Sequence, residues 1–193
     1  MKKIILILVT SLLSLKLFAP FGCMTLEDWK EVQKYIEKQR QLKALIVGMQ
    51  CKETWHDSLS YKKGDPYKKV NKIGALGAFQ FMPKTLKFLG YNGSISYFLN
   101  NQELQIKYMS KLIEHNLSVL KKESKKYKIT PVNFIGKKRY NTHITLAGLI
   151  AASHLAGVGG VQKFLATGYN AKDLNKTSVK TYLTTFKDYK LEI

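Results

Sequence analysis

The stretch from Thr145 to Gly168, TLAGLIAASHLAGVGGVQKFLATG, constrains the fold of this chain most. It is mostly apolar, and many of its side chains are alanine or glycine, so helices built from it can pack closely. Gly157 and Gly168 stand where helix C-caps belong, because glycine adopts the left-handed conformation there at no steric cost. We therefore predict two core helices, over residues 145–155 and 158–167.

Apolar residues at three- and four-residue spacing predict further helices along the chain. One covers residues 26–53, with a break or bend near Gln39–Gln41 that divides it in two. The others are expected at residues 82–89, 101–127 and 178–187.

The segment between residues 56 and 74 has no sustained period and contains Gly64-Asp65-Pro66, so we expect a long loop. The sequence FIGKKRYNTHIT allows a short β-hairpin. A length of 193 residues suits one domain with its own core. We therefore predict a mainly α, single-domain protein with at most a short β-hairpin, covering residues 23–193.

The N-terminal segment, residues 1–22, has the layout of a secretory signal peptide. Lys2 and Lys3 precede a twelve-residue apolar run from Ile4 to Leu15, and small or turn-forming residues follow. The alternative is an uncleaved membrane anchor, since the apolar stretch nearly reaches bilayer length if Lys16 extends toward the interface. Both alternatives predict an extracytoplasmic protein, periplasmic or secreted.

The chain is strongly basic, with 32 Lys and Arg against 13 Asp and Glu and a formal charge of +19. A field of this sign attracts polyanions such as nucleic acid, anionic lipid or the anionic polymers of a bacterial envelope. Arginine, which makes the bidentate contacts of specific nucleic-acid readers, occurs only as Arg40 and Arg139. An exported chain of this kind is expected to meet envelope polymers and not nucleic acid.

The two cysteines, Cys23 and Cys51, could form a disulfide in an oxidising compartment. Alternatively, Cys23 is a lipid-modified first residue of the mature chain, a pattern that Gly22 fits and Pro20 does not. Two cysteines without a nearby histidine pair do not make a zinc site, and we expect neither a metal nor a cofactor.

Three segments carry residues with chemical potential, and each also has a purely structural interpretation. Glu53 ends an apolar helix, where shielding from water favours the protonated form that a general acid requires; a solvated glutamate is the alternative. GALGAFQFMP, residues 74–83, places Gln80 between two phenylalanines and is otherwise a helix entry. AASHLAGVGG contains His154, which is otherwise an ordinary core histidine.

Taken in this order, the three segments resemble those of the lysozyme-like superfamily, in particular domains of the soluble lytic transglycosylase type. Those domains carry a Glu-Ser at a helix end, then Gly-Ala-x-Gly-Leu-Met-Gln-x-Met-Pro, then Ala-Tyr-Asn-Ala-Gly-x-Gly. Here the corresponding segments are Glu53-Thr54, residues 74–83 and residues 153–159. The resemblance covers roughly residues 42–189 and extends to a closing segment, TSVKTYLTTFKDY.

The resemblance implies a lysozyme-like fold and a role for each matching residue. Glu53 is the catalytic acid–base, and Gln80 hydrogen-bonds the sugar or its N-acetyl groups. The glycines let the backbone pass close to the sugar, while Phe79 and Met82 line the cleft or the core beneath it. Because a histidine replaces the family's tyrosine, His154 is expected to hydrogen-bond Glu53 and steer its protonation. Tyr182 is a further cleft residue.

The implied reaction is cleavage of the bond between N-acetylmuramic acid and N-acetylglucosamine in peptidoglycan, with a 1,6-anhydro product. A single carboxylate suffices for this lyase reaction. A hydrolase (a muramidase) normally places a second carboxylate across the bond, and Asp57 and Asp65 are the candidates. Trp55-His56 and an insertion such as LSYKKGDP depart from the family and favour a third alternative, a non-catalytic glycan- or envelope-binding protein. In each case we expect a monomer that binds glycan strands.

Overall fold

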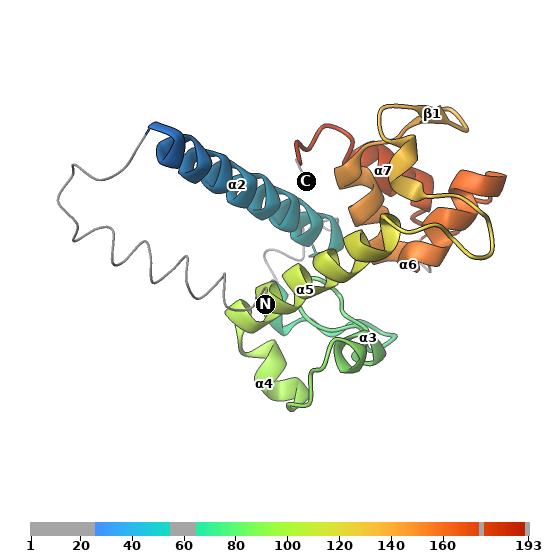
Figure 1. Ribbon diagram of the computed structural model, residues 1–193. Helices are drawn as coiled ribbons and strands as arrows, with labels where there is room; N and C mark the ends of the chain where they lie inside the picture. Colours follow the sequence, from blue (N-terminus) through green and yellow to red (C-terminus); the bar gives the residue numbers. More distant parts are fainter. Residues whose placement is uncertain (1–25, 55–64, 174–175, 192–193) are drawn as a thin grey trace. The chain divides into compact units, whose positions relative to one another are not determined.

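The computed structural model describes residues 26–54, 65–173 and 176–191, and over these it is mainly helical (Figure 1). Its described strands form one two-stranded sheet. The chain divides into two compact units, residues 1–39 and 40–193. The expected signal peptide, residues 1–22, and Cys23 lie outside the described residues.

The described part of the first unit is the beginning of helix α2, which spans Leu26–Thr54. Glu27 and Asp28 lie in its first turn, where acidic side chains favour the positive end of the helix dipole. Its large apolar side chains, Leu26, Trp29, Tyr35 and Ile36, are exposed.

The predicted break near Gln39–Gln41 is wrong, because α2 continues through these residues as a helix. Glutamine and arginine are good helix formers, and the stretch holds neither glycine nor proline to interrupt the hydrogen bonding. In the second unit, α2 buries Gln41, Leu45, Ile46 and Met49.

Helix α6 (Leu146–Thr167) forms the centre of the second unit and packs against α5 (Gln102–Leu120) and α7 (Val179–Thr185). The close packing expected from its small residues is confirmed at Gly148, where a Cβ would lie 3.0 Å from the backbone oxygen of Leu183. Alone among the described helices, α6 is long and apolar enough to cross a membrane, but its inward face is the core of this unit.

Both predicted glycine positions bend or end the helix. Gly157 has φ 67° and ψ 163°, which kinks α6 at the place where two helices were expected. Gly168 is a left-handed C-cap with φ 77°, and its N–H bonds to the carbonyl of Phe164.

Helix α5 ends at Leu120, earlier than the predicted end at residue 127. The six residues after Leu120 are lysine, glutamate and serine, so no apolar side chain remains to hold another turn against the core. Ser124 instead builds a turn, in which its N–H donates to the carbonyl of Ile129 and its hydroxyl accepts from the Tyr127 N–H.

The shorter elements connect these helices. They are η1 (Pro66–Lys68), α3 (Pro83–Phe88), α4 (Ile95–Leu99) and η2 (Pro131–Phe134). Helix α4 was not expected; Ser94 caps it by accepting a hydrogen bond from the Tyr97 N–H.

The predicted hairpin is confirmed as β1 (Lys138–Arg139) paired antiparallel with β2 (Thr142–His143). Tyr140 and Asn141 at its tip both have positive φ, as a two-residue type I′ turn requires. The Arg139 guanidinium donates two hydrogen bonds to the carbonyl of Leu165, which ties the hairpin to the end of α6.

Candidate active site

Glu53 lies one residue before the end of α2, and its side chain is 17 % exposed. It lines a cleft of about 1040 Å³ that lies wholly within the second unit. The cleft is bounded by the end of α2, the segment from Lys69 to Met82, helices α3, α5 and α6, and Asp173. A cleft of this volume is at the upper end of the range for small-molecule sites, which is about 300–1,000 Å³.

Tyr182 on α7 donates a hydrogen bond from its hydroxyl to Oε1 of Glu53. The tyrosine ring is buried and packs against Phe186, so it holds the carboxylate from the core side. Its burial, followed by the nearby charge of Glu53, raises the pKa of the Tyr182 phenol far above its usual value. Tyr182 therefore remains a hydrogen-bond donor at any working pH.

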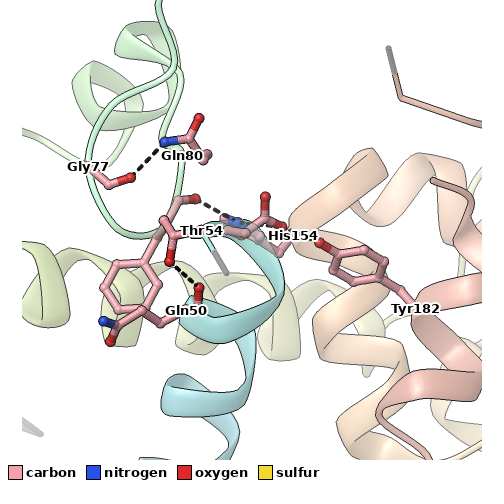
Figure 2. A network of polar contacts seen from close by, with 8 residues as sticks. Gln50, Thr54, Gly77, Gln80, His154 and Tyr182 are labelled. Atoms are coloured by element: carbon pink, nitrogen blue, oxygen red, sulfur yellow. Dashed lines mark hydrogen bonds and ion pairs between the residues drawn. The ribbon is translucent and has the colours of Figure 1, made fainter. Parts of the chain in front are cut away.

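His154 on α6 has its Nε2 2.9 Å from the carbonyl oxygen of Phe79 and 3.8 Å from Oε1 of Glu53. The first distance is a hydrogen bond and the second is not. We assign the ring hydrogen to Nε2, which donates to the carbonyl; Nδ1 is buried with no partner among the described residues. The hydrogen bond to Glu53 that was expected from His154 is therefore made by Tyr182, while His154 ties the Phe79 segment to α6 (Figure 2).

The glycine-rich segment folds into a tight loop closed by Leu76 and Phe81. Their backbones exchange two hydrogen bonds of 2.8 Å, and Gly77 inside the loop has φ 70°. A Cβ at Gly77 would lie 2.1 Å from Oε1 of Gln105, a fully buried side chain of α5. The absence of a side chain at Gly77 therefore makes room for the amide of Gln105. The expected passage of the glycine backbone close to a sugar stays a prediction.

Gln105 fastens the loop to the rest of the unit through three hydrogen bonds. Its Oε1 accepts from the Ala78 N–H at 2.9 Å, and its Nε2 donates to the carbonyls of Tyr67 and Phe98 at 2.9 and 3.0 Å. Its amide is thus almost fully used within the protein, and it holds the loop that carries Gln80.

Gln80 lines the cleft as expected, in a left-handed backbone conformation with φ 50°. Its Nε2 donates to the carbonyl of Gly77 at 2.8 Å, which fixes the side chain (Figure 2). Its Oε1 has no partner among the described residues and remains available as an acceptor.

Phe79 and Met82, the other two residues of this segment that were expected to line the cleft or the core, lie in different environments. Phe79 is fully buried and packs edge-on against Phe81, so its side chain belongs to the core and cannot touch a substrate. Phe79 lies in the turn between Leu76 and Phe81, and only its carbonyl, bonded to His154, bears on the site. Met82 is exposed and lines the cleft.

Several cleft residues were missed by the sequence analysis. Phe88 and His115 lie in the cleft with their rings at nearly right angles, 4.8 Å apart between centroids. Asn116, on the next position of α5, also lines the cleft although it is buried. The sequence offered only a weak signal: Asn116 stands four residues after Leu112 on the buried face of a predicted helix.

The acidic residues also differ from expectation. Asp57 lies outside the described residues. Asp65 accepts from the Tyr67 N–H and caps η1, and it lines a separate hollow beside α4. Among the described residues, the carboxylate that shares the cleft with Glu53 is Asp173, whose Oδ1 accepts from the Thr177 N–H at 2.7 Å.

Cys51 is half-buried on α2, and burial raises the pKa of its thiol, which disfavours the reactive thiolate. Its pairing with Cys23 stays a prediction. Over the described ranges, no three His, Cys, Asp or Glu side chains gather closely enough to hold a metal ion.

Comparison with protein-family models, with curated proteins and with solved structures finds no significant match to this chain.

Proposed function

We propose that this protein is an exported peptidoglycan lytic transglycosylase with Glu53 as its acid–base. One observation carries the proposal: the side chain of Glu53, near the end of α2, opens into a large cleft and accepts a hydrogen bond from the buried hydroxyl of Tyr182. A lysozyme-like arrangement of the fold is part of the proposal, supported by the order of the three segments along the chain.

In the proposed reaction, protonated Glu53 donates its proton to the glycosidic oxygen, and the bond from that oxygen to the anomeric carbon breaks. The substrate's own acetamido group stabilises the positive charge on the ring. Glu53, now ionised, takes the proton of the C6 hydroxyl as this oxygen bonds to the anomeric carbon. The products are a 1,6-anhydro sugar end and a free hydroxyl, and no water is consumed.

Tyr182 has a defined part in this cycle. Its O–H donates to Oε1 of Glu53, so Oε2 is the carboxyl oxygen that is left to carry the proton. The same hydrogen bond becomes stronger when Glu53 is ionised, because hydrogen bonds to charged acceptors are roughly twice as strong as neutral ones. Tyr182 thereby stabilises the carboxylate that must form midway through the reaction.

A muramidase is the second candidate, favoured by Asp173. This carboxylate lines the same cleft as Glu53 and could activate a water molecule for hydrolysis. Its hydrogen bond from Thr177 leaves Oδ2 for that purpose. The products of the two reactions differ by one water, so they can be separated by mass.

The proposed location is outside the cytoplasm, and the proposed partners are glycan strands and anionic envelope polymers. The formal charge of +19, carried almost entirely by lysine, supports retention on an anionic wall.

Digestion of purified peptidoglycan followed by mass spectrometry of the soluble products tests the proposal. We expect muropeptides with 1,6-anhydro ends from the wild type, and a loss of about 10²–10⁴-fold in rate for Glu53→Gln, which removes the acid. Asp65→Asn is the matched control, since Asp65 lies outside the cleft. Reducing ends that depend on Asp173 would establish the muramidase instead. Wall binding without any release would identify a binding protein.

A further inference from the structure

The α5 wall of the cleft contains a largely buried asparagine whose amide has no hydrogen-bond partner among the described residues. Asn116 is only 5 % exposed, lines the cleft, and makes no side-chain hydrogen bond to any described residue. The amide atoms of Asn116 still reach the solvent of the cleft, because the one enclosed side-chain nitrogen or oxygen without a partner among the described residues is Nδ1 of His154. The open cleft is the direction from which a partner for this amide can come.

An exposed aromatic ring lies in the same cleft. Phe88, the last residue of α3, is 63 % exposed, and His115 packs against it at an interplanar angle of 78°. Leu112 and Val119 add apolar surface on α5, on either side of Asn116 in sequence. The wall thus combines one open amide with a fixed aromatic ring and an apolar floor.

This combination identifies the chemistry of the ligand. An aromatic ring packs against the apolar face of a pyranose, and a primary amide can both donate to an acetamido carbonyl and accept from its N–H. No Lys, Arg, Asp or Glu of α5 lines the cleft, so this wall suits a neutral group. Among the described residues that line the cleft, the lysines are Lys69 and Lys72, which belong to the loop segment.

We propose that Asn116 and Phe88 form a sugar subsite that selects an N-acetylated pyranose ring. Phe88 binds the ring face, and Asn116 reads the acetamido group. The inference rests on the proposed function, because it concerns how the same cleft chooses its glycan.

The test is calorimetric titration of the full chain carrying Glu53→Gln, which is not expected to cleave. The probes are chitotetraose, whose rings carry acetamido groups, and cellotetraose, whose rings carry hydroxyls there. We expect Phe88→Ala to weaken both by about three- to tenfold, because it removes the ring that packs on either sugar. Asn116→Leu should weaken only chitotetraose, by about three- to tenfold, and so abolish the preference.

Tyr97→Ala, in the same Glu53→Gln background, is the matched control. Tyr97 is an exposed aromatic residue of α4 that does not line the cleft, so its loss should leave both affinities unchanged. Unfolding by urea checks that each variant is folded before titration.

The contrary outcomes distinguish this inference from the proposed function. Equal affinities in all variants, or no binding of either probe while the wild type still releases anhydro-muropeptides, would overturn the subsite alone. Equal weakening of both probes by Asn116→Leu would overturn the acetamido role. Absence of both binding and release would overturn the proposed function and the subsite with it.

Discussion

Two amide side chains on α5 show how the structural and functional parts of this protein differ. Gln105 and Asn116 are eleven residues apart, about three helical turns, so they lie on the same face. Gln105 is fully buried and makes three hydrogen bonds within the protein, whereas Asn116 is nearly as buried and makes none to the described residues. The first amide builds the loop that carries Gln80, and the second is left open toward the cleft.

The largest effect expected from this contrast is on stability. Gln105→Leu would leave the buried Ala78 N–H, the buried Phe98 carbonyl and the part-buried Tyr67 carbonyl without their partner. At about 1–3 kcal/mol for each such group, we expect the free energy of unfolding to fall by about 3 kcal/mol or more. Asn116→Leu, a change of similar shape on the same helix, should alter it by less than about 1 kcal/mol. Urea denaturation of both variants measures the difference. Equal losses would show that Asn116 has a structural partner and would end the contrast.

A second prediction concerns the glycine that makes room for Gln105. Gly77→Ala would bring a Cβ to 2.1 Å from Oε1 of Gln105 and would strain a backbone with φ 70°. Gly74 has a similar φ of 78° but no atom within 4 Å of the added carbon. Gly74→Ala therefore isolates the backbone strain, about 1–2 kcal/mol. We expect Gly77→Ala to cost more than this by a further 1 kcal/mol or so, from the displaced hydrogen bonds of Gln105. The same thermal or urea midpoint shift for both would mean that Gln105 moves aside freely.

A third prediction concerns Tyr182, whose buried hydroxyl donates its hydrogen bond to the proposed acid–base, Glu53. Tyr182→Phe removes the hydrogen bond to Glu53 and keeps the packing against Phe186. Since a hydrogen bond to a charged group contributes about 1.5–3 kcal/mol, we expect kcat to fall by about 10- to 100-fold. A rise in KM without a change in kcat would place Tyr182 among residues that support substrate binding only. Ser153, which lines the cleft but bonds the Leu149 carbonyl of its own helix, offers a control as Ser153→Ala.

The sequence predicted these features unevenly, for physical reasons. Helix α6, its kink and the hairpin follow from local patterns: small apolar residues, glycines at C-cap positions and a turn between two polar strands. The hydrogen bond to Glu53 comes from Tyr182, which lies 129 positions later in the sequence, so local patterns could not predict it. Tyr182 was expected in the cleft but without this contact, and His154 was expected to make it.

The same limit explains the two amides. An amide on the buried face of a helix looks the same in sequence whether its partners come from the protein or from a ligand. The glycine at position 77 was noticed, but its space is filled by a side chain from a different helix. Local periodicity also extended α5 too far, since charged residues are good helix formers even where no core remains to pack against.

The smallest expected effect concerns ionisation of Tyr182. Burial and the charge of Glu53 raise the pKa of this phenol in the folded protein, so folding favours its protonated form. Its contribution to stability is therefore fully present below the unfolded pKa, about 10, and is lost as pH rises beyond it toward the folded pKa. Above pH 10, the difference in unfolding free energy between wild type and Tyr182→Phe should change by about 1.4 kcal/mol per pH unit, against the wild type. Urea titrations of the two proteins between pH 8 and 11 measure it, with pH limits set by the reference pKa of about 10. A difference in unfolding free energy that stays constant with pH would mean that water reaches the Tyr182 hydroxyl. Tyr182 would then resemble Asn116, which is open to the cleft, and not Gln105, whose partners all lie within the protein.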